Sequence, residues 1–573
     1  MSNKNALLLS LGHNSSAIYA DTKTVIGYET ERINKIKSSS ASPIIAIEEI
    51  LKHQEIPDRT PIFMTHWFDQ FGSFKPSKYS QGIEDFAKSK DSVLWTHSKS
   101  FTHHDAHAWS AKGFFRQYIK TQHFSINKEA REDDVYYIVA DGFGNFQEVI
   151  SIYKQSNHNI NDLECVHKCY GYENSLGLMY QYATLFCGMK MQQDEYKFLG
   201  YESKIDEFLD NQEISDLLDA AQKTVEKFVA IELKNNKEIR AGSTELIDYD
   251  KLDTVKNGWL HIFTDICTQS EEKDFFSIRA RSIVAFFIQT VIEETLCCII
   301  DKFSIKNVVL SGGIFYNVKL NNRIVKKVPG LVSVVPVAGD QGAAIGFYER
   351  YIGEFDWSTL AISKREFSQD QLNIAQSNEA VFIFKNRNHC LDFIASKINK
   401  NEIVNLITGN CEYGPRALCN TSSIFMPNQK NVDDNNYHNR RNDIMPVAPI
   451  IRDVDMDLVF EDTYKRVVGS NEFMIVTHDY LVHSKPCNSG VYHKYPLKQR
   501  YSGRPQVITE KNNSLMFDLL TQMDIKMLVN TSYNKHGEPI CLSMQDIMRT
   551  HYFQLKNAEH TKAKINLVIL TDQ

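Results

Sequence analysis

The chain has 573 residues, of which 42% are hydrophobic and 24% are charged, and it carries a formal net charge of -7. Because single hydrophobic cores stop growing at about 250 to 300 residues, this length predicts two or more domains. The negative charge argues against a generally basic nucleic-acid-binding protein, although local basic stretches can still bind nucleic acid. Eleven cysteines without a C-x-x-C pair favour reduced thiols and a cytoplasmic protein.

The N-terminal half is predicted to be an α/β scaffold. Apolar runs around a Gly-His-Asn-Ser-Ser turn in residues 6–28 predict a strand, a turn and a returning strand. Further strands are predicted at 135–140, 148–153 and 308–310, and glycine turns that could bind phosphates follow the first and last of these. A predicted helix at 275–303 contains an apolar segment with two glutamates, which indicates a buried helix and no membrane partner.

A polar run at residues 363–371 interrupts the apolar periodicity and predicts a domain boundary. Beyond it, short strands are predicted at 403–407, 474–477 and 526–529, and a helix at 514–522. The second part is therefore expected to be a mixed α/β domain.

Two histidines in the sequence T-H-H-D-A-H-A-W-S have the spacing of metal ligands. His103 and His107 are four residues apart, so they would share one face of a helix. Two imidazoles on one face suit a transition metal. A surface pair of histidines is the alternative.

The stretch E-Y-G-P-R-A-L-C-N, residues 412–420, predicts an anion site. Gly414 and Pro415 restrict the backbone to an unusual path, and Arg416 follows with a planar guanidinium that suits phosphate or carboxylate. A surface turn beside a structural arginine is the alternative.

Taken together, motifs along the chain resemble those of the NodU/CmcH carbamoyltransferases. The family phrase E-F-G-P-R-A-L-G-N-R-S corresponds to residues 412–422, and N-T-S-F-N-x-x-G-E-P-I corresponds to residues 530–540. The motif H-H-x-x-H-A falls on residues 103–108 and an early H-D-x-S motif on residues 13–16. The resemblance extends from about residue 7 to about residue 543, so it covers nearly the whole chain.

The resemblance implies an α/β protein with an N-terminal actin-like (ASKHA, ribonuclease-H-like) domain over residues 1–365. It implies a C-terminal YrdC-like α/β domain over residues 366–573. The activity implied is ATP-dependent O-carbamoyl transfer. Carbamoyl phosphate yields carbamate, ATP converts the carbamate to carbamoyl-adenylate, and an acceptor hydroxyl displaces AMP.

The same resemblance implies site residues. His103, His107 and Asp340 are the implied ligands of a metal ion, with iron, manganese, zinc and magnesium as candidates. His13 is the implied general base for the acceptor hydroxyl, because imidazole titrates near neutrality, although a histidine bonded to its own turn is the alternative. Arg416 is expected to bind the polyanionic substrates. Further contacts to ATP and carbamoyl phosphate are implied for Asp141, Gly142, Lys197, Gly312, Gly313, Asn317, Asn321, Arg441, Arg504, Asn530 and Ser532.

Among the departures from the family pattern, three bear on the chemistry. Asn14 stands where the family usually has Asp, Thr421 stands where it usually has Arg, and Met445 lies in a phrase that usually has Arg before Pro. Either Arg440 and Arg441 compensate, or activation uses a rearranged pocket. A nucleotide-binding regulator without transfer activity is a further alternative.

The acceptor is predicted from residues 480–509, which contain no acidic residue. Basic and aromatic residues alternate in this stretch, as a nucleic-acid groove requires. Some members of the family that the chain resembles carbamoylate hydroxymethylated bases in viral DNA, so the resemblance and this stretch together favour the hydroxymethyl group of 5-hydroxymethylcytosine in viral DNA as the acceptor. A sugar or secondary-metabolite hydroxyl is the alternative acceptor, and a solvated loop that serves the ATP pocket is the alternative explanation of the stretch. The basic residues are Lys485, His493, Lys494, Lys498, Arg500 and Arg504, and the aromatic ones are Tyr480, Tyr492, Tyr495 and Tyr501.

Overall fold

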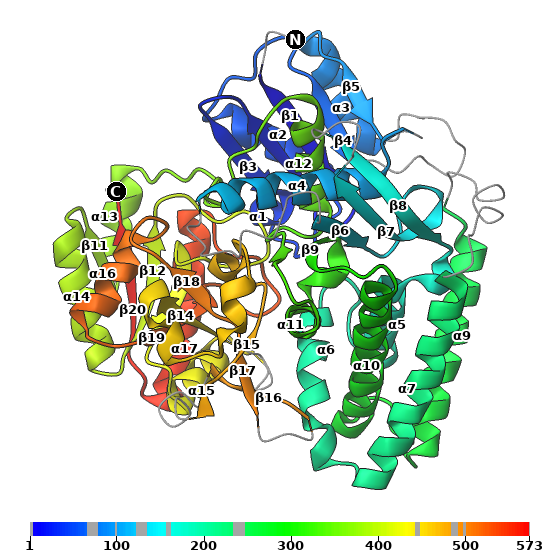
Figure 1. Ribbon diagram of the computed structural model, residues 1–573. Helices are drawn as coiled ribbons and strands as arrows, with labels where there is room; N and C mark the ends of the chain where they lie inside the picture. Colours follow the sequence, from blue (N-terminus) through cyan, green and yellow to red (C-terminus); the bar gives the residue numbers. More distant parts are fainter. Residues whose placement is uncertain are drawn as a thin grey trace.

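The computed structural model describes residues 4–65, 78–97, 100–121, 135–155, 162–232, 247–441, 447–482, 491–496 and 500–571. Strands in these residues form four sheets, which helices cover (Figure 1). The prediction of an α/β protein is confirmed.

The first sheet has the strand order β3-β2-β1-β4-β5. The pairs β1–β2 and β2–β3 are antiparallel, and the pairs β1–β4 and β4–β5 are parallel. Its strands are β1 (Ala6–Ser10), β2 (Ser16–Ala20), β3 (Val25–Glu29), β4 (Ile62–Thr65) and β5 (Leu94–Thr96). The hairpin predicted in residues 6–28 is confirmed, and its second strand leads into a third.

The second sheet repeats this topology, with the order β8-β7-β6-β9-β10. Again the first three strands are antiparallel, and β9 and β10 continue in parallel. Its strands are β6 (Val135–Ala140), β7 (Glu148–Gln155), β8 (Leu163–Tyr170), β9 (Asn307–Ser311) and β10 (Val332–Val334). Two sheets of one topology are the related halves expected of an actin-like core.

Two helices lie between these sheets: α4 (His103–Thr121) and α12 (Asp340–Tyr351). Alternate side chains of β1 explain the layering, because they point to opposite faces of the sheet. Leu8 packs in the core that contains α4 and α12, whereas Leu7 and Leu9 pack against α2 (Ile44–Leu51) on the other face. The other helices near the first sheet are α1 (Thr30–Asn34) and α3 (Lys78–Ser89).

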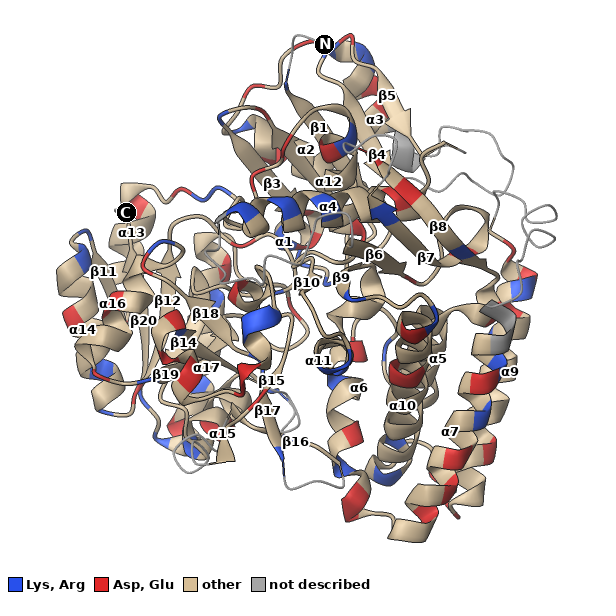
Figure 2. Cartoon of the chain, viewed as in Figure 1, with Lys and Arg blue, Asp and Glu red and all other residues tan. Residues whose placement is uncertain are grey.

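A helical layer covers the far side of the second sheet, around α10 (Ile278–Lys302). This helix has the length and hydropathy of a membrane span, but 78% of its most apolar window is buried in the protein, as predicted from its glutamates. Charged residues are distributed along the outer helices α7 and α9 (Figure 2). The surrounding helices are α5 (Leu176–Phe186), α6 (Glu195–Tyr201), α7 (Asn211–Glu232), α9 (Tyr249–Gln269) and α11 (Val318–Lys327).

The C-terminal part is built on a seven-stranded sheet with the order β11-β20-β12-β13-β19-β14-β18. Its strands are β11 (Val381–Phe384), β12 (Ile403–Thr408), β13 (Thr421–Phe425), β14 (Ala448–Arg452), β18 (Gln506–Ile508), β19 (Met527–Ser532) and β20 (Ile565–Leu570). Helices α14 (Arg387–Asn399) and α16 (Ser514–Gln522) pack on one face. Helices α13 (Gln369–Gln376), α15 (Gln429–His438) and α17 (Met544–Thr561) pack in the other two cores of this part.

The strand predicted at residues 474–477 is wrong. A 3-10 helix, η8 (Ser470–Phe473), precedes this segment, and Met474 then adopts a left-handed conformation with a φ of 54°. Side chains, not a neighbouring strand, bind the segment: Asn321 Nδ2 donates to the carbonyl oxygen of Ile475 at 2.7 Å. The next strands, β15 (His478–Asp479), β16 (His493–Lys494) and β17 (Tyr501–Gly503), form a small antiparallel sheet.

A buried ion pair joins the first sheet to the loop that precedes β13. The Glu29 carboxylate, at the end of β3, accepts hydrogen bonds from Arg32 Nη2 (2.8 Å) and from the Gly414 N–H (3.0 Å). Arg32 Nη2 also donates to the Gly414 carbonyl oxygen at 2.6 Å. Gly414 has a φ of 100°, which favours glycine. These contacts fix the Gly-Pro corner against the N-terminal part.

The change Arg32→Ala is expected to lower the free energy of unfolding by about 3 to 5 kcal/mol, because it leaves the buried Glu29 carboxylate without its cation. Chemical denaturation measures this loss. Arg59→Ala, which breaks an exposed ion pair with Asp91, is the matched control and should change stability little. A loss from Arg32→Ala no larger than that of the control would contradict the prediction.

Glu293 on α10 gives stability a pH dependence. Burial raises the pKa of its carboxyl to about 8, so the folded protein holds a proton that the unfolded chain releases near its ordinary pKa of about 4.3. Because the folded state binds more protons between these values, this carboxyl lowers stability as the pH rises from about 5 to about 8. Glu293→Gln should therefore gain stability relative to the unmodified protein over that range, by roughly 1.4 kcal/mol per pKa unit. Thermal unfolding of Glu293→Gln and of the unmodified protein, at about pH 5 and at about pH 8, measures the gain. A stability difference between the two proteins that does not change with pH would contradict the prediction.

Candidate metal centre and anion-binding cleft

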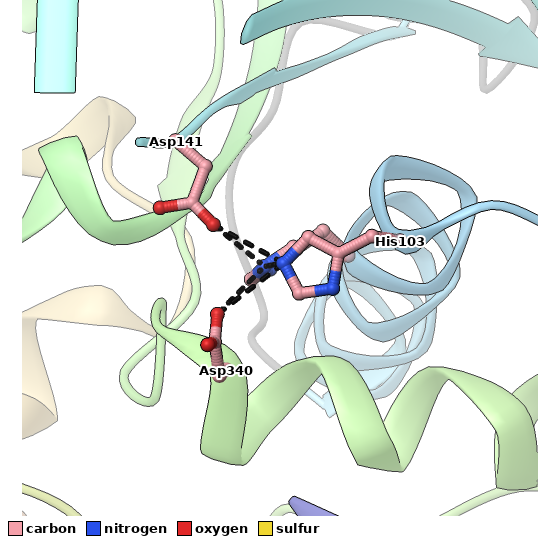
Figure 3. Close-up of side chains that lie close together, drawn as sticks. His103, Asp141 and Asp340 are labelled. Atoms are coloured by element: carbon pink, nitrogen blue, oxygen red, sulfur yellow. Dashed lines mark hydrogen bonds and ion pairs between the residues drawn. The ribbon is translucent and has the colours of Figure 1, made fainter. Parts of the chain in front are cut away.

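Four potential metal ligands converge beside the second sheet. His103 and His107 lie one turn apart at the start of α4, Asp141 directly follows β6, and Asp340 begins α12. Their ligand atoms all lie within 4.8 Å of one another. Figure 3 shows Asp141 and Asp340 directed at His103, whose Nε2 lies 3.2 Å from Asp141 Oδ2 and 3.3 Å from Asp340 Oδ1. His107 Nε2 lies 3.2 Å from His103 Nε2.

The second ring nitrogen of each histidine has a separate partner. His107 Nδ1 lies 3.1 Å from Ser311 Oγ, and His103 Nδ1 lies 3.4 Å from His97 Nε2. Such contacts orient metal-binding imidazoles and leave the other nitrogen for the ion. The two histidines thus present their Nε2 atoms to the cluster.

The local sequence explains this convergence. Thr102 and Asp105 form reciprocal contacts at the first turn of α4: the Thr102 N–H donates to Asp105 Oδ2 at 2.7 Å, and the Asp105 N–H donates to Thr102 Oγ1 at 3.4 Å. These contacts fix the turn that contains His103. Because β6 and β9 are parallel neighbours, Asp141 and Ser311 lie at the same sheet edge.

The electrostatics of the cluster suit a cation. Burial opposes a charged imidazole at His103, but hydrogen bonds with Asp141 and Asp340 outweigh it and raise its pKa to about 10. Burial likewise opposes the Asp141 charge, but His103 and His107 hold the pKa of that carboxyl well below its usual range. Two carboxylates and two imidazoles therefore fit a divalent or trivalent metal. His104 lies outside the cluster, with its Nδ1 2.7 Å from Ser151 Oγ.

A cleft of about 300 Å³ lies between the N-terminal and C-terminal parts, next to the metal centre. Gln341, the neighbour of Asp340, contributes to its wall. Residues from both parts line it, among them Asn14, Glu31, Lys37, Glu195, Tyr196, Gly200, Tyr316, Lys319, Arg416, Arg441, His493, Arg504, Asn530, Ser532 and His536.

Three arginines in this cleft have no carboxylate partner among the described residues: Arg416, Arg441 and Arg504. Burial lowers the pKa of each, to about 10 for Arg441, and Arg416 further lowers that of Arg504. Arg441 donates instead to neutral oxygens of Thr531, Ser532 and Asn534. Uncompensated guanidinium groups in a partly desolvated cleft make a strong site for a polyanion.

The loop that contains Arg416 is held by Glu412. One oxygen of this fully buried carboxylate accepts hydrogen bonds from the N–H groups of Leu418 (2.7 Å), Asn420 (2.8 Å) and Thr421 (3.0 Å). Asn530 Nδ2 also donates to the Ala417 carbonyl oxygen at 2.7 Å. Hydrogen bonds to the Glu412 carboxylate and to the Ala417 carbonyl oxygen therefore fix the conformation of the loop that was predicted to bind an anion.

Other predicted ligands lie at or near these two features. His13 follows β1 and precedes Asn14, which lines the cleft. Burial raises the pKa of the Glu195 carboxyl in the same cleft. Ser532 Oγ lies in the cleft and donates to Asn534 Oδ1 at 2.6 Å. Lys197 pairs with Asp194, and its Nζ lies 3.3 Å from His536 Nε2.

The predicted glycine turns surround Asp141. The Gly313 N–H donates to Asp141 Oδ1 at 3.1 Å. A Cβ on Gly312 would lie 2.1 Å from the Ala140 carbonyl oxygen, and the residue has a φ of 106°, so close packing and conformation both require glycine. A Cβ on Gly142 would meet nothing within 4 Å.

Two side chains that were predicted to contact the nucleotide are hydrogen-bonded to other groups of the protein. Asn317 caps α11 by accepting from the Leu320 N–H at 3.1 Å, and its amide pairs with Gln289. Asn321 is fully buried, and its Nδ2 donates to the carbonyl oxygens of Phe315 and Ile475. Both side chains hold α11 in place.

Comparison with known families decides the identity of the fold and motifs. Residues 89–347 match the family model described as Carbamoyltransferase N-terminus, and residues 395–560 match the one described as Carbamoyltransferase C-terminus. The chain belongs to the carbamoyltransferase family. The resemblance inferred from the motifs is confirmed.

Relatives within the family are distant. The chain is 26% identical over 49% of its length to the uncharacterized protein MJ1051 of Methanocaldococcus jannaschii, and 29% identical over 38% to the 3'-hydroxymethylcephem-O-carbamoyltransferase of Amycolatopsis lactamdurans. It is 24% identical over 43% to the nodulation protein NolNO of Sinorhizobium fredii. The matched segments span 55%, 40% and 37% of these relatives' own lengths.

Solved structures overlap this chain only in part. HypF from T. kodakarensis is 13% identical to this chain, with a TM-score of 0.29. The match covers 61% of this chain and 48% of the HypF chain. A ROK family glucokinase from Streptomyces griseus, solved with glucose and AMPPNP, is 10% identical to this chain, with a TM-score of 0.25. The match covers 60% of this chain and 97% of the glucokinase chain.

Thr421, one departure from the family pattern, contacts an arginine from another part of the chain. Thr421 is fully buried, and its Oγ1 accepts from Arg365 Nη1 at 3.0 Å. Arg365 also donates to the carbonyl oxygens of Thr408 and Asn420. A guanidinium therefore contacts position 421 although the residue there is threonine. Met445 lies outside the described residues.

Glu29, Tyr316 and Gln341 are among the cleft residues that the motifs left unmarked. Only Glu29 had a signal in the sequence, because it is the first acid of an E-T-E-R run at the end of an apolar strand. Asp141 was expected at the nucleotide, whereas its Oδ2 lies among the potential metal ligands.

His103→Ala is expected to weaken metal binding at least about tenfold, because the Nε2 of His103 lies at the centre of the ligand set. Titration of the purified protein with divalent manganese or zinc, followed by calorimetry, measures the affinity. His261→Ala, on the exposed surface of α9, is the control and should bind as the unmodified protein does. Equal affinity of both variants would exclude a metal at this cluster.

Proposed function

We propose that this protein is an O-carbamoyltransferase that uses ATP and carbamoyl phosphate. The three arginines without carboxylate partners carry the proposal, because two polyanionic substrates must approach each other in one cleft. The family supports the chemistry, and the adjacent metal-ligand cluster supports a second reaction step nearby.

The proposed reaction has three balanced steps. Water converts carbamoyl phosphate to carbamate and phosphate. A carbamate oxygen then attacks the α-phosphorus of ATP, which gives carbamoyl-adenylate and releases pyrophosphate. Finally the acceptor hydroxyl attacks the carbamoyl carbon, its proton passes to a base, and AMP leaves. Arg416, Arg441 and Arg504 would bind the phosphates and stabilise the charge that develops on them.

The transfer step is assigned to the metal centre. His103, His107, Asp141 and Asp340 would hold the ion, which when bound polarises phosphate or carbonyl oxygens. His13 is the proposed base for the acceptor hydroxyl; its neighbour Asn14 lines the cleft. The glycine turns at Gly142 and Gly313 are proposed to approach the nucleotide.

We assign transfer to an actin-like domain over residues 1–365 and activation to a YrdC-like domain over residues 366–573. The duplicated sheets support the first assignment, and the separate seven-stranded sheet supports the second. A cytoplasmic location is proposed because the ten cysteines among the described residues are all free.

The acceptor hydroxyl belongs either to 5-hydroxymethylcytosine in viral DNA or to a sugar or secondary metabolite. Contacts made by residues 491–496 and 500–504 favour a sugar or secondary-metabolite hydroxyl. Lys494 pairs with Asp206, and Tyr492 packs between Tyr480 and Tyr501, so these groups are engaged within the protein. Lys485 and Lys498 lie outside the described residues.

The proposal is tested by measuring the release of pyrophosphate from ATP with and without carbamoyl phosphate. Arg416→Ala should reduce carbamoyl-phosphate-dependent release by about a hundredfold or more, because it removes a cation from the activation site. His103→Ala should retain this release but lose transfer to the acceptor. Lys385→Ala, on an exposed residue outside both features, is the control. Absence of carbamoyl-phosphate-dependent release from the unmodified protein would refute the function.

A further inference from the structure

We infer that a small polar recess beside the metal centre selects the carbamoyl group, with Gln341 and Tyr316 as the residues that recognise it. The inference rests on the proposed function. Both residues line the cleft, and each contributes a buried polar atom: Gln341 Oε1 has no hydrogen-bond partner, and Tyr316 Oη, which the Gly339 N–H approaches, has no acceptor for its O–H. A buried polar atom without a partner is rare and costs stability, which indicates a ligand group that completes it.

The two atoms converge on Gly339, the residue before Asp340. A Cβ built on Gly339 would lie 3.0 Å from Gln341 Oε1 and 3.4 Å from Tyr316 Oη. The φ of Gly339 is -80°, so its backbone conformation does not require glycine. A side chain at this position would press against both polar atoms, so glycine leaves them accessible to a group in the cleft.

Glu29 determines which end of the Gln341 amide faces the recess. Gln341 Nε2 lies 3.4 Å from Glu29 Oε1 and donates to it, so Oε1 is directed elsewhere. The reversed amide would oppose its oxygen to a carboxylate, which only accepts hydrogen bonds. Because Gln341 is 3% exposed and Glu29 is held by Arg32, the free acceptor is fixed in place.

Tyr316 supplies the complementary donor. Burial and the charges of Glu29 and Asp340 raise the pKa of its phenol, so the O–H keeps its proton. Tyr316 lines the cleft together with Arg416 and with Gln341, the neighbour of Asp340, so it lies near both the arginines and the metal centre. The recess therefore lies on the path from activation to transfer.

The chemistry of the recess matches a carbamoyl group. The carbamoyl carbonyl accepts one hydrogen bond, from Tyr316 O–H, and its NH₂ donates one, to Gln341 Oε1. An acetyl group keeps the carbonyl but has a methyl in place of the NH₂, so it would leave Gln341 unpaired. Sites built to bind an N–H reject analogues that lack it.

The test compares carbamoyl phosphate with acetyl phosphate as the donor for pyrophosphate release by the full-length protein. Gln341→Leu should lower the ratio of the carbamoyl to the acetyl rate by about tenfold or more, because only the carbamoyl group uses Oε1. Tyr316→Phe should lower both rates and keep the ratio, because both groups use the phenol O–H. Tyr552→Phe, on the exposed surface of α17, is the matched control.

An unchanged ratio in Gln341→Leu would overturn the inference while the proposed function stands. No release from the unmodified protein with carbamoyl phosphate would refute the proposed function and the inference together. If Gln341→Leu does not fold, Gly339→Ala replaces it, since a methyl group there would occupy the recess without backbone strain. It should lower the carbamoyl rate by about tenfold, and an unchanged rate would overturn the inference.

Discussion

The Glu29 carboxylate is the contact on which the arrangement of the cleft depends. One of its oxygens binds Arg32 and the Gly414 N–H, and the other accepts from Gln341. It therefore connects the first sheet, the corner before Arg416 and the first turn of α12. A buried carboxylate is unfavourable alone, and its cost is offset here by a guanidinium and a backbone donor. Residues far apart in the sequence are held in one geometry by this group.

Around that anchor, charge is distributed unevenly. In the part of the chain that the structure describes, Arg416, Arg441 and Arg504 lie in the cleft without acidic partners, while two carboxylates and two imidazoles gather at the metal-ligand cluster. The arginines destabilise the folded protein when no ligand is bound, because like charges are brought together in a partly desolvated interior. Natural proteins retain such costs at functional sites. The two features lie side by side because Asp340 and Gln341 are consecutive residues.

Local patterns predicted those parts of the protein that depend on local physics. The spacing of His103 and His107 required only a helix, and the helix at 514–522 was found at those residues. The place of Asp141 beside the histidines could not be predicted, because β6, α4 and α12 meet only in the folded chain. No sequence pattern marks an atom such as Gln341 Oε1 that lacks a partner. A strand was wrongly predicted at residues 474–477, because the buried irregular segment found there is as apolar as a strand.

The first turn of α12 has a thermodynamic consequence. Asp340 belongs to the metal-ligand cluster and Gln341 to the wall of the cleft, so a movement of this turn changes both. Occupancy of one feature then alters the free energy of occupying the other. Such coupling is reciprocal: any factor by which a metal ion strengthens binding of a ligand in the cleft equals the factor by which that ligand strengthens binding of the metal.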